Sequence, residues 1–335
     1  MTTIDRFSDA LTLIWQQFLK VASYPLDPSQ RIYGPYLFTS LLFAIGVYLV
    51  SGSRDPEHRK GSSDLARLTK FVFPRPIWRH PSSWVDVRYF IPHQMVRIWI
   101  YTSFATFITT GVGRSTYLGL GGLLDSPGGV FEVTPGPAAA IAYTVVNVVV
   151  IDFLAYVMHY FQHAVPILWQ FHKVHHSAEV LNPLTNYREH PIDNVSYAAT
   201  LAIGTGTSAG VFQAMFGFPP PLIQILGINM LMFLFNASGY HLRHSHVWLR
   251  WPGPLAYLFG CPAHHQIHHS CRPEHINKNM AFMFPIWDVL FGTFYLPKER
   301  EELVFGIGDG TEGRYRSFLS LYLYPFAELF RSWRT

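Results

Sequence analysis

Histidine is the residue whose number and spacing in this chain point most directly to chemistry. The chain has 335 residues and 17 histidines, and 14 of these lie between His159 and His275. Residues three or four apart lie on one face of a helix, so a pair at that spacing can present two imidazoles to one metal ion. Four motifs have this spacing: His159-x-x-x-His163, His172-x-x-His175-His176, His241-x-x-His244 and His265-x-x-His268-His269.

Adjacent histidines add a second constraint. His175 and His176 diverge by about 100° on a helix, so they suit two neighbouring ions rather than one. The motifs together offer ten donors, more than the roughly four to six that one ion takes. We therefore predict two metal ions, with His159, His163, His172, His175, His176, His241, His244, His265, His268 and His269 as ligands. The sequence leaves supporting, capping or exposed positions open for His246, His264 and His275.

The donor type limits which metal these ligands suit. An all-imidazole set fits zinc, copper, iron or nickel. The sequence has no HExxH motif, and its two cysteines, Cys261 and Cys271, have no zinc-site spacing. Ten imidazoles at the ends of membrane helices fit an iron site for oxygen chemistry better. A membrane zinc-dependent hydrolase and a non-enzymatic membrane protein that binds haem or transports metal remain the alternatives.

The elements that must position these histidines are apolar. Hydrophobic residues make up 49% of the chain and charged residues 14%, against about 25% charged in typical soluble proteins. A bilayer core needs about twenty apolar residues per helix. Residues 32–53, 98–113 (extended upstream through 89–91) and 133–151 lack charge and are predicted as three spans. Residues 194–242 carry no charge over 49 positions, and the prolines at 219–221 divide them into predicted spans at 195–217 and 222–242.

The distribution of lysine and arginine predicts the orientation. Residues 114–136 contain one such residue, Arg114, whereas residues 53–93 contain eight. Positive charge marks cytoplasmic loops, so this topology delivers every histidine motif to the cytoplasmic face. The eight residues are Arg54, Arg59, Lys60, Arg67, Lys70, Arg75, Arg79 and Arg88.

The predicted fold class is an all-α integral membrane protein, a transmembrane helical bundle of about four to five spans with a cytosolic histidine-rich helical cap. Residues 1–130 would form an N-terminal region with an amphipathic helix at 8–22 and the first two spans. Residues 137–297 would carry the histidine motifs, and 298–335 would form an amphipathic tail against the membrane surface. No cleavable signal peptide is evident, and no basic run suits nucleic acid.

Longer motifs around the histidines resemble a known family. The relevant runs are Asp152-Phe-x-x-Tyr156-x-x-His159-x-x-x-His163, Leu168-Trp169-x-Phe171-His172-x-Val174-His175-His176-Ser177, Arg188-x-His190-Pro191, the stretch from Phe235 to Ser245, Pro262-x-His264-His265-x-x-His268-His269, Asn277-x-Asn279 and Trp287-Asp288-x-x-Phe291-Gly292-Thr293. Over about 137–297 the chain resembles the fatty acid hydroxylase/sterol desaturase superfamily of membrane di-iron enzymes, which implies that 137–297 is the catalytic domain. The first 130 residues match no family that we can name.

That resemblance implies a membrane di-iron mono-oxygenase that uses O2 to hydroxylate or desaturate a C–H bond of a fatty acyl, sterol or related lipid. It implies metal ligation by the predicted histidines, with His241 less defined because the spacing in its motif varies, and leaves His190 as a ligand or a support. Asp152 lies two helical turns before His159, and with Asp288 it is expected to hold an imidazole tautomer. Gly119-Leu-Gly121-Gly122 is no nucleotide fingerprint, so a separate electron donor of reductase, cytochrome or ferredoxin type is expected.

Overall fold

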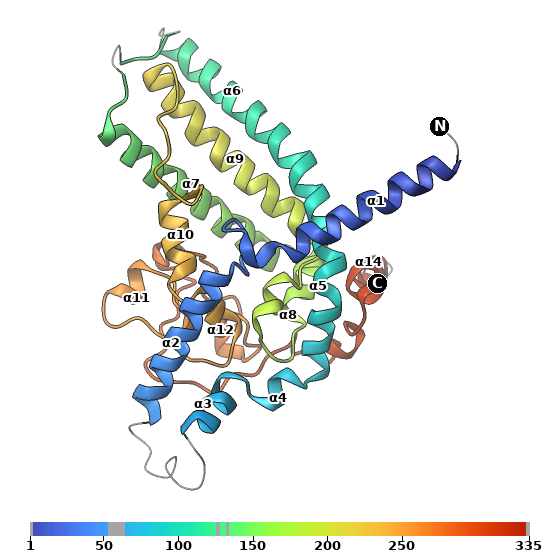
Figure 1. The fold of residues 1–335 in the computed structure, drawn as a ribbon. Helices are drawn as coiled ribbons and strands as arrows, with labels where there is room; N and C mark the ends of the chain where they lie inside the picture. The colour runs from blue at the N-terminus through green and yellow to red at the C-terminus, as the bar shows by residue number, and fades with distance from the viewer. Residues whose placement is uncertain (1–2, 53–63, 125–127, 132–133, 333–335) are drawn as a thin grey trace.

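The computed structural model describes residues 3–52, 64–124, 128–131 and 134–332, and it is mostly helical, as the sequence predicted. Figure 1 shows a layer of long helices above a cap of shorter ones. The α-helices are α1 (Thr3–Ala22), α2 (Gly34–Gly52), α3 (Asp64–Val72), α4 (Arg75–Trp78), α5 (Pro81–Ile100), α6 (Thr106–Leu123), α7 (Pro137–Ala164), α8 (Pro166–His176), α9 (Pro191–Phe216), α10 (Met230–Ala237), α11 (Leu255–Leu258), α12 (Pro262–His268), α13 (Ile286–Phe291) and α14 (Phe318–Ser332).

The upper layer consists of α6, α9 and α7, which lie side by side (Figure 1). α5 and α6 form one continuous helical rod, because a π-helical turn (Tyr101–Ala105) joins them without a break. α7 and α9 each begin with a proline at the first helical position, where its missing N–H costs nothing. α9 ends at Gly217, whose left-handed conformation (φ 81°) stops the helix.

Small residues let the upper helices approach closely. A Cβ atom on Gly206 of α9 would lie 2.7 Å from the carbonyl oxygen of Thr109 in α6. One on Gly210 would lie 2.6 Å from the carbonyl oxygen of Gly113. Such glycine contacts bring backbones together where no hydrophobic effect drives association, as within a bilayer. The uncharged 194–217 stretch therefore serves close helix packing.

Two helices of the described chain are long and apolar enough to cross a membrane, namely Gly34–Ser51 in α2 and Pro137–Ala164 in α7. These correspond to the first and third predicted spans. The fourth predicted span lies in α9, a helix of 26 residues, whereas the second, 98–113, is divided among the end of α5, the π-helical turn and the first part of α6. Neither α6 nor α9 reaches the hydropathy of α2 and α7. The fold is that of a helical membrane protein, and the number of spans stays a prediction.

The predicted membrane helix at 222–242 is wrong as a helix of that length. A two-stranded hairpin (β1, Gln224–Ile225, and β2, Ile228–Asn229) precedes the eight-residue α10. Leu226 (φ 50°) and Gly227 (φ 79°) form its turn. Extended chain covers about 3.3 Å per residue against 1.5 Å in a helix. The segment that leads from the end of α9 back to the cap is therefore partly extended, and it contains fewer helical residues than hydropathy alone suggests.

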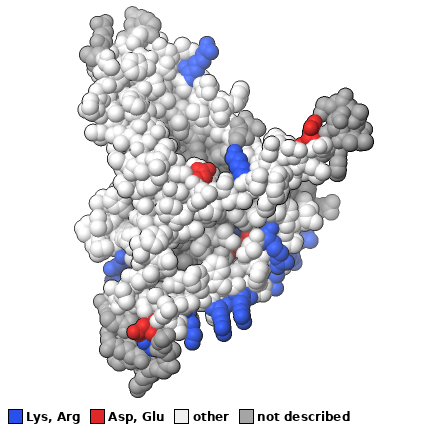
Figure 2. All heavy atoms as spheres, viewed as in Figure 1, with Lys and Arg blue, Asp and Glu red and all other residues white. Residues whose placement is uncertain are grey.

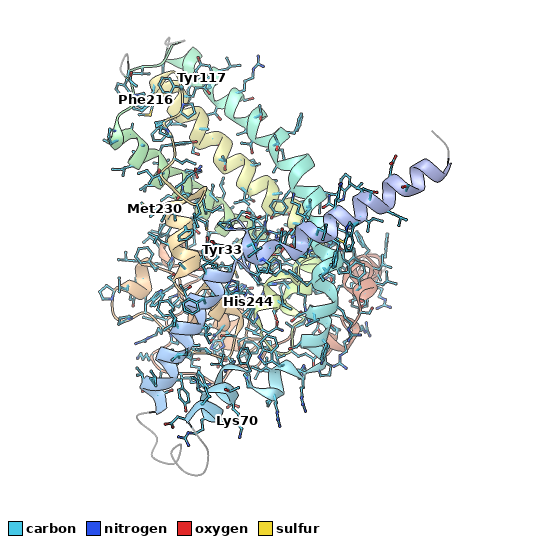
Figure 3. All side chains as sticks on the ribbon, in the orientation of Figure 1. Tyr33, Lys70, Tyr117, Phe216, Met230 and His244 are labelled. Atoms are coloured by element: carbon cyan, nitrogen blue, oxygen red, sulfur yellow. The ribbon has the colours of Figure 1, made fainter. Side chains whose placement is uncertain are left out.

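The cap lies below this layer and holds the histidines. Figure 3 places His244 inside the cap, whereas Tyr117 and Phe216 lie at the far end of the upper layer. Short 3-10 helices at Tyr24–Leu26, Pro183–Tyr187, Tyr240–His244, Pro273–His275 and Glu312–Arg314 complete it. α7 runs from the upper layer into the cap and turns at Val165 into α8, so that two histidine motifs follow each other directly.

Two amphipathic helices lie at the edges of the molecule. α1 projects away from the body in Figure 1, and Leu11, Ile14 and Trp15 are each more than half exposed on it. α14 packs on α8 and α5, yet exposes Leu319 and Leu323. Lysines and arginines gather on the lower side in Figure 2, over α3, α4 and the start of α5. Arg54, Arg59 and Lys60 of the predicted basic segment lie outside the described residues.

Candidate metal centre

Nine of the ten predicted histidines converge in two neighbouring clusters. Within each cluster, one ring nitrogen of every member lies within 4.8 Å of those of all the others. The structure sends the adjacent histidines of each His-x-x-His-His motif to different clusters. Cluster A contains His159, His163, His172, His176 and His268, and cluster B contains His175, His244, His265 and His269.

Backbone carbonyls set the tautomer of three of these histidines. The Nδ1 of His159 lies 2.7 Å from the carbonyl oxygen of Met280, and that of His268 lies 3.0 Å from the carbonyl oxygen of Lys278. The Nδ1 of His175 lies 3.3 Å from the carbonyl oxygen of Arg188. A carbonyl only accepts, so in each case Nδ1 carries the hydrogen and Nε2 keeps a lone pair for a metal. His265 differs, because its Nδ1 faces a guanidinium nitrogen of Arg243 at 3.1 Å.

The remaining nitrogens cannot satisfy one another by hydrogen bonds. In cluster B the Nε2 atoms of His244, His265 and His269 lie 3.0–3.1 Å apart in a triangle. A ring nitrogen is either donor or acceptor, so at least one side of such a triangle pairs two like atoms. In cluster A the Nε2 atoms of His163, His176 and His268 are buried without a hydrogen-bond partner. A cation in each cluster would accept the lone pairs that no hydrogen-bond donor reaches, so these residues fit two metal ions.

Burial keeps the cluster histidines neutral. Desolvation lowers the pKa of His175 to about 4. It lowers the pKa of His172 and His268 well below the usual histidine value, and neighbouring histidines add to the effect. The same holds for His176, His244, His265 and His269. Metal binding needs the neutral imidazole, so the folded chain holds these ligands in the binding form well below neutral pH.

The segment after the last histidine motif presents two of the carbonyls that orient imidazoles. Asn277 and Asn279 both have positive φ angles, 58° and 53°, a conformation that asparagine tolerates better than most residues. The Asn279 side chain donates to the carbonyl oxygens of His264 and Tyr295. These contacts fix the turn that aims the Lys278 and Met280 carbonyls at cluster A.

Asp152 and Asp288 act on the same segment rather than on an imidazole. Asp288 accepts from the backbone N–H groups of Met280 and Ala281 at 2.8 and 3.0 Å. Asp152 accepts from the backbone N–H groups of Met283 and Phe284 and from the Trp287 indole. The prediction that they contact a ligand histidine needs correction, because backbone and indole donors occupy both carboxylates. Asp288 supports the His159 tautomer indirectly, through the Met280 backbone, and Asp152 anchors the residues that follow.

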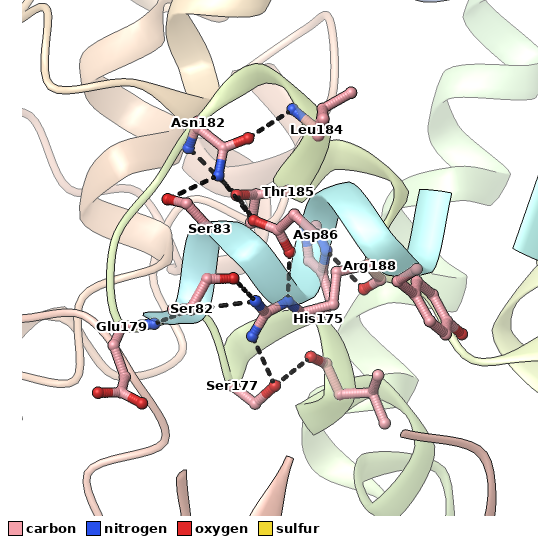
Figure 4. Close-up of polar contacts among 12 residues, drawn as sticks. Ser82, Ser83, Asp86, His175, Ser177, Glu179, Asn182, Leu184, Thr185 and Arg188 are labelled. Atoms are coloured by element: carbon pink, nitrogen blue, oxygen red, sulfur yellow. Dashed lines mark hydrogen bonds and ion pairs between the residues drawn. The ribbon is translucent and has the colours of Figure 1, made fainter. Parts of the chain in front are cut away.

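A buried polar network orients His175 from the other side (Figure 4). Asp86 of α5 accepts from the Arg188 guanidinium at 2.6 Å and from the side chains of Asn182 and Thr185. Arg188 also donates to the carbonyl oxygen of Ser82 at 2.6 Å. This network fixes the Arg188 backbone, whose carbonyl faces His175. α5 therefore helps to position a histidine of cluster B.

Asp193 is a site residue that the sequence reasoning missed. It is buried, and its Oδ2 lies 3.7 Å from the Nδ1 of His172. Gln162 donates to its other oxygen at 3.0 Å. Burial raises the pKa of Asp193 well above its usual range. Its position in the sequence could have indicated this role, because Asp193 directly precedes the uncharged stretch 194–242. A single carboxylate next to such an apolar segment usually has a partner or a function.

Four predicted candidates lie outside both clusters. His241, which was expected among the ligands, instead directs its Nε2 to the carbonyl oxygen of Arg31, so the structure does not bring it to a metal site. His190 caps α9 through Ile192 N–H and faces the carbonyl oxygen of Tyr322. His246 faces the carbonyl oxygen of Phe71, and His264 accepts from the backbone N–H of Cys261. These contacts support the cap.

Two cavities lead to the histidine clusters from different sides. A cavity of about 500 Å³ lies among α5, α7, α9 and α10, and a narrow neck lined by Arg31, Tyr197, Tyr240 and Phe282 continues to both clusters. A second opening of about 270 Å³ reaches cluster A past Trp169 and Cys271. A bulky substrate and a small reactant could therefore approach the histidines from different directions.

Helices of membrane length and two adjacent all-histidine clusters define a metal-binding membrane protein, and comparison with known proteins shows what its histidine-rich segment is similar to. Residues 144–293 match the family model described as fatty acid hydroxylase. Over this segment, somewhat less than half of its length, the chain is similar to the fatty acid hydroxylase/sterol desaturase superfamily. The segment contains all nine cluster histidines.

Individual relatives match over part of their length. Human alkylglycerol monooxygenase is 32% identical over 157 residues, covering 47% of this chain and 31% of that protein. Ornithine lipid hydroxylase OlsE of Rhizobium tropici is 30% identical over 187 residues, covering 55% and 50%. A cholesterol 25-hydroxylase-like protein of Danio rerio is 31% identical over 147 residues, covering 43% and 52%. The chain thus spans about half the length or less of these relatives, and no solved structure matches it.

Proposed function

We propose that this protein is a membrane-bound di-iron oxygenase that hydroxylates or desaturates a C–H bond of a lipid. The observation that carries the proposal is the convergence of nine histidines, all but His163 buried, in two clusters at the inner end of a large, mostly apolar cavity. The named activities of the relatives, monooxygenase and lipid hydroxylases, support it. Iron fits an all-nitrogen donor set, as the resemblance also implies.

The chain's residues would bind, orient and shield. Cluster A and cluster B would each hold one ion, and the carbonyls of Met280, Lys278 and Arg188 would keep three ligand rings in the binding tautomer. The cavity would exclude water and hold the lipid in register with the clusters. When bound, the two irons would supply the oxidising power that places one atom of O2 in a C–H bond, while two electrons and two protons reduce the other atom to water.

Orientation and electron supply belong to the same proposal. We propose that the histidine cap faces the cytoplasm, because the basic side chains of α3, α4 and α5 gather on its side of the molecule (Figure 2). A separate reductase, cytochrome or ferredoxin-type protein would deliver the electrons, as the sequence predicts.

Lipid profiling of cells grown under isotope-labelled O2, with and without the chain, tests the proposal. A lipid that gains one labelled oxygen atom, or loses two hydrogens, only when the wild-type chain is expressed is the expected result. His268→Ala should abolish the product because it removes a cluster A nitrogen. His246→Ala, outside both clusters, should not. Zinc without iron in the active protein, or a Soret band, would favour the hydrolase or haem alternatives instead.

A further inference from the structure

The cavity leading to the clusters has an apolar wall and a charged inner end. Its wall is lined by Ile98, Ile151, Leu201, Met232, Phe235 and Met283. Arg31 and Arg97 also line it, and Arg31 continues into the neck that touches both clusters. A pocket that only holds a hydrocarbon chain has no need of two guanidinium groups. The charged end therefore requires an explanation.

These two arginines share one carboxylate. Arg31 donates to Oε1 of Glu189 at 2.9 Å, while the Nε of Arg97 lies 3.9 Å from its Oε2, too far for a hydrogen bond. Burial opposes ionisation of Glu189, but the nearby arginines lower its pKa to about 2, so it is charged. The trio then carries one excess positive charge. A buried charge without a partner is costly, so the arrangement favours an anion.

Arg97 has donor capacity left over. One terminal nitrogen donates to the Gln94 side chain at 3.2 Å, and its guanidinium lies over the Tyr101 ring at 4.7 Å. Its Nε is buried with no hydrogen-bond partner. Arginine presents a planar set of donors that matches phosphate and carboxylate oxygens. The Arg97 guanidinium lines the cavity and makes one hydrogen bond within the described residues, so it is suited to bind an anionic oxygen.

The other charged groups around the cavity do not cancel this excess. Lys20 of α1 lies at the exposed edge of the cavity and adds a positive charge. Asp152 also lines it, but three N–H donors occupy its two oxygens. Arg243 lies close enough to Asp152 to interact with its charge. Figure 2 shows the surface hollowed beside α1, between the upper helices and the cap.

We propose that this cavity binds an amphiphile with an anionic group, such as a phosphate ester, and holds that group between Arg31 and Arg97 with the hydrocarbon chain along the apolar wall. The neck beyond Arg31 is polar, with Glu189, Asp193 and two tyrosines. A terminal methyl group there would lie against charged and polar side chains and shield them from water, which costs free energy. The end of the lipid that approaches the clusters is therefore the end that bears the polar group.

The orientation of the lipid also predicts which carbon is oxidised, and this part rests on the proposed function. If the clusters oxidise a lipid, the oxidised carbon lies near the anionic group and not at the far end of the chain. Binding of the anionic amphiphile itself needs no oxygenase activity. The two parts can be tested separately.

Binding is tested with the full chain in a non-ionic detergent by native mass spectrometry. The probes are a monoacylglycerol phosphate, the monoacylglycerol with the same acyl chain, and inorganic phosphate. We expect the wild type to prefer the phosphate ester by about tenfold or more, as a charge-assisted hydrogen bond implies. Arg97→Gln should remove most of that preference, and Arg97→Lys should retain part of it. Arg88→Gln, a matched change at an exposed position of the same helix, should leave it unchanged.

Equal binding of the two lipids by the wild type, or an unchanged preference in Arg97→Gln, would overturn the proposal. So would displacement of the phosphate ester by an equal concentration of inorganic phosphate, which would indicate a site for the free ion. Melting temperature and metal content of each variant show whether it is folded. If the protein prefers the phosphate ester but oxidises the methyl end of the acyl chain, the proposed orientation of the lipid in the cavity is refuted. If the wild-type protein binds the phosphate ester selectively but contains no iron and oxidises no lipid, only the proposed oxygenase function is refuted.

Discussion

Removing the Asp86 carboxylate should destabilise the cap and weaken metal binding in cluster B. In Asp86→Ala the Arg188 guanidinium loses its 2.6 Å partner, while Asn182 and Thr185 lose acceptors at 2.7 and 2.8 Å. The Arg188 side chain is 1% exposed, so water cannot replace the carboxylate. Arg188 would then shift, and its carbonyl would no longer face His175.

The magnitude follows from burial. Breaking a buried ion pair by removing one partner costs about 3–5 kcal/mol, because the other charge stays buried. For a chain of this size that corresponds to a fall in melting temperature of roughly 4–7 °C. Glu274→Ala is the control, since Glu274 pairs with Arg272 at 2.8 Å with both side chains about 40% exposed. An exposed pair is worth about 0–1 kcal/mol.

Differential scanning fluorimetry and metal analysis of the purified proteins measure both effects. Asp86→Ala should melt at a lower temperature and lose one of two bound metals first, because His175 belongs to cluster B alone. Equal melting temperatures for Asp86→Ala and Glu274→Ala, or equal loss of both metals, would show that the network does not position His175.

Three further predictions concern pH, helix packing and the supporting carboxylate. Unfolded histidines protonate near pH 6.5, whereas the folded pKa of His175 is about 4. The metal-free protein should therefore lose stability as pH falls from 6.5 towards 4, and metal should stay bound at pH 6; thermal melts and metal analysis across pH check this, and a flat profile would contradict it. Gly206→Val should separate α6 from α9 and lower the melting temperature with the metal content unchanged, because its Cβ would lie 2.7 Å from a backbone oxygen. Asp288→Ala should leave two backbone N–H groups unpaired, at about 1–3 kcal/mol each, and reduce metal occupancy in cluster A; full occupancy would argue against the Met280 contact.

Local spacing was enough to find the parts of the site that lie on single helices. His159 with His163 and His172 with His176 share helix faces, so their convergence follows from the 3.6-residue period. The membrane-length helices α2 and α7 likewise follow from local composition. Both kinds of pattern depend on residues close together in the sequence.

Features that depend on distant contacts could not be predicted in this way. His241 and His244 have the same spacing as His172 and His175. The His241 ring nevertheless faces the carbonyl oxygen of Arg31, a residue far away in the sequence. Asp86 and Asp193 gave no motif, because their partners lie on other elements. The short α10 escaped prediction because hydropathy does not distinguish helix from extended chain in an apolar stretch.

The most direct test of the account is the number and identity of metal ions bound per chain. Elemental analysis of the purified wild-type protein from iron-supplemented cells should give two irons, one for each cluster. His244→Ala should reduce the value towards one, since it removes a cluster B ligand. A single ion per chain, or two in the wild type that His244→Ala leaves unchanged, would contradict the claim that the two histidine clusters form a dinuclear metal centre.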